Sequence, residues 1–144
     1  MTHYDAGDYS AKHPPNTVLD STVARAVQQA ASEGTVTCAA AHDIAGELGV
    51  SPSEIGRTID LLQLRIVECQ MGLFGYQPRK KVVEPANSVA PDLRDAINRA
   101  ATDGRIACLA AWEIAREFGL PKMDVTAACE AMRIKIRQCQ LGAF

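Results

Sequence analysis

One stretch of the chain occurs twice. Residues 18–74 align without a gap to residues 88–144 at an offset of 70, and 16 of the 57 aligned pairs are identical. Many other pairs exchange similar residues, such as Val27 for Ile97. A duplication of this length indicates two copies of one structural unit. Units this small bury a limited share of their surface, so we expect the two copies to pack on each other.

The sequence divides into four segments. Residues 1–17 are polar and predict a disordered tail. Residues 18–76 form repeat 1, residues 77–87 form a basic, proline-containing linker or wing strand, and residues 88–144 form repeat 2. No stretch approaches the roughly 18 apolar residues of a membrane span, and the N-terminal residues lack a secretory signal pattern. We therefore expect a cytoplasmic protein that does not enter a membrane and whose cysteines are reduced.

Each repeat begins with a helical pattern of alanine and aliphatic residues. Ser21 is placed to cap this helix in repeat 1, and Gly34 and its copy Gly104 predict left-handed C-caps. A β-branched residue occurs in each of the next short stretches, residues 35–38 and 105–108. Each stretch predicts a short strand or extended bridge.

A second and a third helix follow in each repeat, joined by a polar turn. The second is predicted over residues 39–48 and 109–118 and ends at a glycine. The spacing of alanine, glycine and the next aliphatic residue resembles the helix-turn-helix pattern. In that pattern the small alanine lets two helices cross closely, and the glycine gives the turn its positive φ. The matching residues are Ile44, Ala45, Gly49, Val50 and Ile55, and in the copy Ile114, Ala115, Gly119, Leu120 and Val125.

The third helix leads into an alternating stretch that is typical of a half-buried strand. The order of elements in each repeat resembles the winged helix-turn-helix fold. The resemblance implies a mostly α fold with small β-ribbons, arranged as two tandem winged-helix-like repeats. A complete wing needs a second strand, which residues 76–83 would supply in repeat 1. Repeat 2 has no such stretch, so its wing is missing, shortened or completed by another chain.

The resemblance also implies nucleic-acid binding, with the third helix in the major groove. Each third helix carries one basic and two acidic side chains, which is unfavourable beside phosphates. The only base readers that it offers are Arg57, Thr58, Lys122 and Thr126. Better phosphate contacts lie on the repeat 2 strand and in the linker, at Arg133, Lys135, Arg137, Arg79, Lys80 and Lys81. A solvated strand face and a solubilising linker would account for the same cations.

Charge does not decide between nucleic acid and another partner. The net charge of −2 combines −4 over residues 16–76, +2 over residues 77–85 and +1 over residues 86–144, with −1 in the tail. A protein that grips a polyanion usually has a stronger basic bias. We narrowly favour a DNA-binding, transcription-regulator-like protein.

The close alternative is an adaptor that binds another protein through the third helices or through His42 and Trp112; a homodimer is a separate possibility. His42 and Trp112 occupy the same position in the two second helices, away from the apolar face. An exposed tryptophan at this position suits a partner interface. Equally, Trp112 could cover the seam between the two repeats.

A third interpretation is a thiol-based metal or redox-sensing module. Cys38 and Cys69 are copied as Cys108 and Cys139, and each pair could lie close if the short strands pair. Two such pairs could ligate a Zn²⁺ ion or form disulfides. The chain lacks the short Cys-x-x-Cys spacing of strong zinc sites, so structural cysteines are the simpler interpretation. Cys129 has no copy and is expected in the core.

No arrangement of residues predicts catalysis, so we expect a non-enzymatic protein without a resident cofactor. The most specific segments are Cys-Gln-Met-Gly-Leu-Phe and its copy Cys-Gln-Leu-Gly-Ala-Phe. Gly72 and Gly142 predict tight turns there, with Phe74 and Phe144 as hydrophobic plugs. The pattern does not explain why glutamine occurs in both copies.

Overall fold

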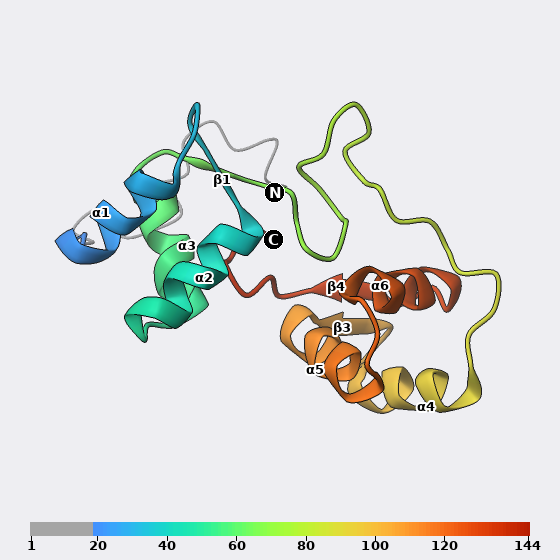
Figure 1. The fold of residues 1–144 in the computed structure, drawn as a ribbon. Helices are drawn as coiled ribbons and strands as arrows, with labels where there is room; N and C mark the ends of the chain where they lie inside the picture. Colours follow the sequence, from blue (N-terminus) through green and yellow to red (C-terminus); the bar gives the residue numbers. More distant parts are fainter. Residues whose placement is uncertain (1–18) are drawn as a thin grey trace. The chain divides into compact units, whose positions relative to one another are not determined.

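The computed structural model describes residues 19–144, so the predicted disordered tail lies outside the described residues. The described chain is mostly helical with short strands, as the sequence predicts (Figure 1). The first half contains α1 (Ser21–Ala30), β1 (Thr35–Thr37), α2 (Cys38–Leu48), α3 (Pro52–Leu61) and β2 (Arg65–Val67). The second half contains α4 (Pro91–Ala100), β3 (Arg105–Ala107), α5 (Cys108–Phe118), α6 (Lys122–Ala131) and β4 (Lys135–Arg137).

The chain packs as two compact units whose limits differ from those of the repeats. Unit 1 contains the chain up to Cys69 together with Gln140–Phe144, and unit 2 contains Gln70–Cys139. The segment that follows each β2 or β4 strand therefore belongs to the unit built from the other repeat. Unit 1 holds α1, α2 and α3, and unit 2 holds α4, α5 and α6.

The first helix starts and ends differently from the sequence-based prediction. Asp20, and not Ser21, is the N-cap, because its carboxylate accepts hydrogen bonds from the amides of Thr22 at 2.9 Å and Val23 at 3.1 Å. The helix stops before Gly34, which lies with Glu33 in a two-residue turn. Both turn residues have positive φ, 51° and 79°, which is the type I′ geometry that suits an acidic residue followed by glycine. Asp103 and Gly104 repeat this turn in unit 2.

The second helix of each unit ends at a glycine, as predicted. Gly49 and Gly119 both adopt left-handed conformations, with φ of 66° and 64°. The next amide, that of Val50 or Leu120, donates back into the preceding helix. This closes α2 and α5 and turns the chain into α3 and α6.

The strands pair within each unit, but they form no complete wing. β1 pairs with β2, and β3 pairs with β4, each in parallel and over three residues. Residues 76–90 contain no strand, so the second wing strand predicted over residues 76–83 is absent. Prolines at positions 78 and 85 lack the amide that a ladder requires. Part of this stretch packs on α6 instead, as described below.

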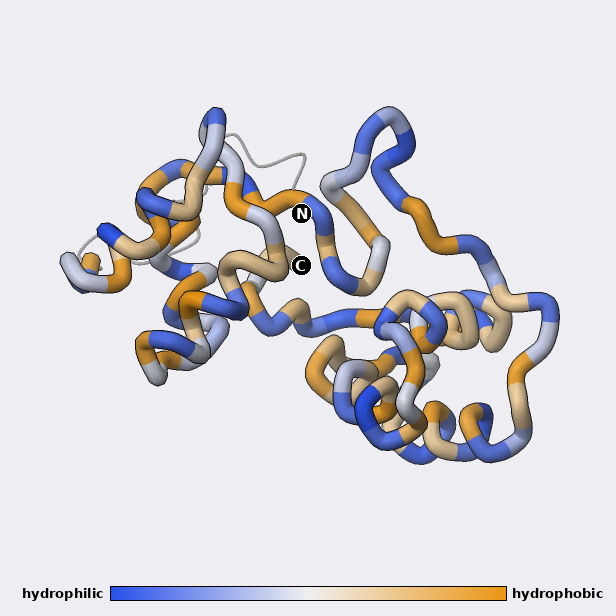
Figure 2. The backbone as a smooth tube through the Cα atoms, in the orientation of Figure 1, coloured by the Kyte–Doolittle hydropathy of each residue, from blue (hydrophilic) through white to orange (hydrophobic). Residues whose placement is uncertain are grey.

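Each unit has its own small apolar core. The helices present alternating apolar and polar residues, visible as alternating orange and blue along the tube in Figure 2. The largest fully buried side chains are Ile55, Ile59, Ile66, Val27, Val36 and Leu141 in unit 1, and Ile97, Ile106, Val125 and Met71 in unit 2. Leu141 and Met71 belong to the segments that follow β4 and β2 and that pack in the unit built from the other repeat. These segments therefore contribute directly to the two cores.

Candidate nucleic-acid interface

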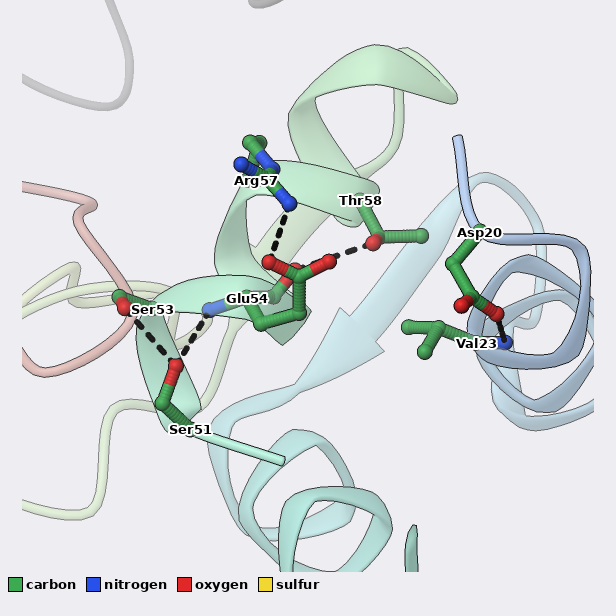
Figure 3. Close-up of polar contacts among 7 residues, drawn as sticks. All are labelled: Asp20, Val23, Ser51, Ser53, Glu54, Arg57 and Thr58. Atoms are coloured by element: carbon green, nitrogen blue, oxygen red, sulfur yellow. Dashed lines mark hydrogen bonds and ion pairs between the residues drawn. The ribbon is translucent and has the colours of Figure 1, made fainter. Parts of the chain in front are cut away.

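The outward face of α3 is occupied by its own ion pair. Arg57 pairs with Glu54 one turn earlier, so its guanidinium is neutralised by a carboxylate on the same helix (Figure 3). The Ser51 hydroxyl accepts a hydrogen bond from the Glu54 amide and lies 3.0 Å from the Ser53 hydroxyl. The Ser51 hydroxyl caps the helix. Arg57 is the only basic side chain of α3, and it is paired with Glu54.

Two of the four predicted base readers are buried. Thr58 is 2% exposed, and its hydroxyl donates to the Glu54 carbonyl oxygen at 3.0 Å (Figure 3). Thr126 is 1% exposed, and its hydroxyl donates to the Lys122 carbonyl oxygen at 3.5 Å. A buried hydroxyl that bonds its own helix cannot reach a base edge, so the assignment of both threonines as base readers is wrong.

The exposed face of α6 is partly covered by the stretch that precedes α4. The Ala86 amide donates to the Ala127 carbonyl oxygen at 3.0 Å, and Lys81 forms an ion pair with Glu130. Both contacts lie on the side of α6 away from the buried Val125. These contacts occupy part of the helix surface that a helix-turn-helix protein places in the major groove.

The linker cations are mostly engaged nearby. Arg79 pairs with Glu84 at 3.0 Å, and both side chains are largely exposed. Lys81 is paired with Glu130, and both Lys80 and Lys81 are exposed. Exposed pairs of this kind contribute little stability and are easily broken, but they lower the positive field of the linker.

A group of four cations lies on and beside the paired strands of unit 2. Arg105 on β3 stands in register with Lys135 on β4, and Arg137 lies two residues further along β4. Arg133 precedes β4 in a left-handed conformation with φ of 59°. We call Arg105, Arg133, Lys135 and Arg137 the basic cluster. All four side chains are exposed, and none forms an ion pair with another residue of the described chain.

A groove of about 450 Å³ opens between two members of the basic cluster. Its lining comes from the end of α4, from β3 and from the residues around β4. The lining residues are Ala100, Thr102, Arg105, Ile106, Ala107, Arg137 and Gln138. Two guanidinium groups beside hydroxyl and amide groups form a surface suited to phosphate oxygens.

Sequence reasoning placed three members of this cluster and missed Arg105. Arg105 could have been found from sequence, because the first short strand of each repeat was expected to lie beside the strand that follows the third helix. A parallel register between them brings Arg105 level with Lys135. Unit 1 carries Thr35, Gln63, Arg65 and Val67 at the corresponding positions, so the basic cluster is confined to unit 2.

A second groove of about 450 Å³ lies on α5 and the start of α6 in unit 2. Leu109 is 52% exposed at its edge, and the Lys122 ammonium lies 4.4 Å from the centre of the Trp112 ring. The groove is lined by Leu109, Trp112, Glu113, Ala115, Arg116, Leu120, Pro121 and Lys122. Trp112 is half-buried here, and so is His42 at the corresponding position of α2.

None of the five cysteines forms a disulfide bond. Cys38, Cys69, Cys108 and Cys129 are buried, and Cys139 is half-buried. Within residues 19–144 no group of three or more histidine, cysteine, aspartate or glutamate side chains is arranged to hold a metal ion. Burial raises the pKa of the Cys129 thiol from 9.0 to about 11, and the nearby Glu130 carboxylate adds to this shift. This thiol therefore stays protonated and unreactive at neutral pH.

None of the helices in the described part of the chain combines the length and the apolar character needed to cross a bilayer. Comparison with models of known protein families gives no match to this sequence. Searches among curated proteins and among solved structures likewise find no match. The geometry of the chain itself is therefore the basis for a proposed function.

Proposed function

We propose that this chain is a non-enzymatic nucleic-acid-binding protein that grips phosphates through the basic cluster of unit 2. The observation that carries the proposal is the group of four exposed cations on or beside the paired strands β3 and β4, none of which forms an ion pair with another described residue. Phosphate contacts of this kind supply affinity without reading sequence. Duplex DNA is the target that we favour.

The charge of the two units supports the choice of unit 2. Residues 70–139 carry 11 basic and 8 acidic side chains, a net charge of +3. The residues assigned to unit 1 carry 4 basic and 9 acidic side chains, a net charge of −5. A polyanion is attracted to the first and repelled by the second.

In this proposal the two units are tandem winged-helix-like modules whose third helices no longer read DNA bases. Three helices with a glycine turn between the second and third support this relationship. The third helices have buried threonines, paired charges and a covering segment. Contact through the strands therefore replaces contact through the third helix, and sequence selectivity is expected to be low.

The test is the salt dependence of binding to a labelled random DNA duplex, measured by fluorescence anisotropy. Four phosphate contacts predict that log K falls with log salt concentration with a slope of about −3.6. The double variant Arg105→Gln/Arg137→Gln should flatten the slope by about 2 and weaken binding at every salt concentration.

A matched control removes the same charge elsewhere. Arg25 on α1 and Arg94 on α4 are exposed and lie outside the cluster. The double variant Arg25→Gln/Arg94→Gln should keep the wild-type slope, since non-contacting charges do not release counterions. Equal effects of the two double variants, or no binding at low salt, would refute phosphate contact by the basic cluster.

The groove on α5 favours a second candidate, a protein-interaction adaptor. An exposed leucine, a half-buried tryptophan and a lysine over its ring form an apolar surface with a positive edge. Such a surface suits an aromatic or aliphatic anchor of another protein. Leu109→Glu should leave DNA binding intact if nucleic acid is the target, and abolish partner binding if the adaptor reading is right.

A further inference from the structure

The Gln-x-Gly-x-Phe stretches that follow Cys69 and Cys139 each pack in the unit built from the other repeat. Gln140–Phe144 belongs to unit 1, although it continues directly from β4 of unit 2. Within unit 1 it is well buried, with Leu141 2% and Ala143 6% exposed. The first copy of the segment is likewise assigned to unit 2, where Met71 is 1% and Phe74 is 7% exposed.

The docking site on α3 is built around a glycine. A Cβ atom added to Gly56 would lie 1.7 Å from the Leu141 carbonyl oxygen and 2.6 Å from the Leu141 carbonyl carbon. The backbone of the segment therefore rests directly on the helix, an approach that a larger side chain forbids. In unit 2 the segment packs on α6 too, since a Cβ at Gly72 would lie 3.3 Å from the Met123 sulfur.

We infer that α3 carries a peptide-binding site for the Gln140–Phe144 segment, and that this site accepts the segment from a second copy of the chain. The site recognises a local feature, a backbone pressed on Gly56 with two apolar anchors, and an identical segment from another molecule presents the same feature. Exchange of an identical element is a low-cost route to association between copies.

The test mixes two variants. One lacks the Gln140–Phe144 segment, and the other has a blocked α3 site. The receptor chain lacks residues 140–144, so its α3 site is empty. The donor chain carries Gly56→Val, which blocks its own site, and a fluorophore after residue 144. The receptor should raise the anisotropy of the donor in a saturable way, and light scattering should give the mass of two chains.

Two controls identify the site. Leu141→Asp in the donor should weaken binding about 10- to 100-fold, since it removes a buried leucine anchor. Gly56→Val introduced into the receptor should abolish binding. Binding that survives both changes would overturn the inference, because it would come from another surface.

The experiment gives a clear answer whether the truncated receptor is folded or unfolded. A receptor that is folded by circular dichroism and does not bind the donor refutes the inference. A receptor that is unfolded must regain its helical signal when the donor is added, since binding to the folded form pulls the equilibrium. A helical signal that stays lost at saturating donor also refutes it.

Discussion

Gly46 and Gly56 are two helical glycines of unit 1 with opposite surroundings. A Cβ at Gly46 would meet nothing within 4 Å, whereas one at Gly56 would overlap the Leu141 backbone. Gly46→Ala should raise the free energy of unfolding by up to about 1 kcal/mol, because alanine is the better helix former. Gly56→Ala should lower it by about 1–3 kcal/mol, because the segment must shift.

Urea unfolding followed by circular dichroism measures both glycine variants in one experiment. Each change adds one methyl group to a helix, so helix propensity alone predicts the same direction for both. Equal stabilisation by the two substitutions would show that residues 140–144 do not press on α3.

Cys129 gives the stability of unit 2 a dependence on alkaline pH. Its pKa is about 11 in the folded chain and 9.0 in the unfolded chain, so between these values only the unfolded chain releases the proton. The contribution of this group is constant below pH 9 and falls by about 1.4 kcal/mol for each unit of pH above it. We expect a loss of about 2–3 kcal/mol by pH 11.

Comparison with Cys129→Ala separates this effect from other titrations. The alanine variant is less stable at pH 8 because it leaves a small cavity, but its stability should fall less steeply between pH 9 and pH 11. Parallel pH profiles for the two proteins, measured by urea unfolding in reducing buffer, would contradict the assignment.

Helix caps show how the two repeats diverged in their elements. The Thr37 hydroxyl caps α2 by accepting from the Ala40 amide at 3.0 Å. Ala107 holds the same position before α5 with nearly the same backbone, φ −71° and ψ 145° against −73° and 150°, and offers no side-chain cap. Unit 2 thus lacks a hydrogen bond that unit 1 possesses.

Adding a threonine cap to α5 should raise the free energy of unfolding, and removing the threonine cap from α2 should lower it. Ala107→Thr should stabilise the chain by about 0.5–1 kcal/mol, and Thr37→Ala should destabilise it by about 1 kcal/mol. Thermal unfolding of the two variants tests this directly. A destabilising Ala107→Thr would mean that the threonine side chain does not reach the α5 amides.

Local features of these elements were predictable from sequence, and non-local ones were not. Gly49 and Gly119 end their helices as expected, because a C-cap depends on the glycine itself. Gly34 was misassigned because a glycine after a helix also suits a tight turn when an acidic residue precedes it. The parallel pairing that adds Arg105 to the basic cluster depends on residues 30 positions apart, which local patterns do not fix.

At the scale of the whole chain, the last five residues stabilise the first unit and not the unit that precedes them in sequence. Residues 140–144 follow unit 2 in sequence but pack in unit 1. Deleting them should therefore loosen α3 more than α6. Amide hydrogen exchange should show faster exchange at Ile55 and Ile59, with Val125 and Cys129 little changed.

Greater loss of protection in α6 than in α3 would contradict the assignment of this segment.

The limits of the repeats could be found by alignment, but the limits of the compact units could not. The duplicated sequence is compatible with each segment packing on its own repeat or on the other. The contacts of Leu141 with Gly56 and of Gly72 with Met123 distinguish these arrangements.

The contact of Leu141 with Gly56 also constrains the order of events during synthesis. Gly56 and Leu141 are 85 positions apart, so the ribosome makes all of repeat 2 before unit 1 can receive its segment. Domains usually fold in the order in which they are made, and contacts across long loops slow folding. Here unit 1 completes its packing only after residues 140–144, which follow α6 in the sequence, have been translated. The α3 surface beside Gly56 is thus exposed in the nascent chain, where a neighbouring chain on the same message can reach it.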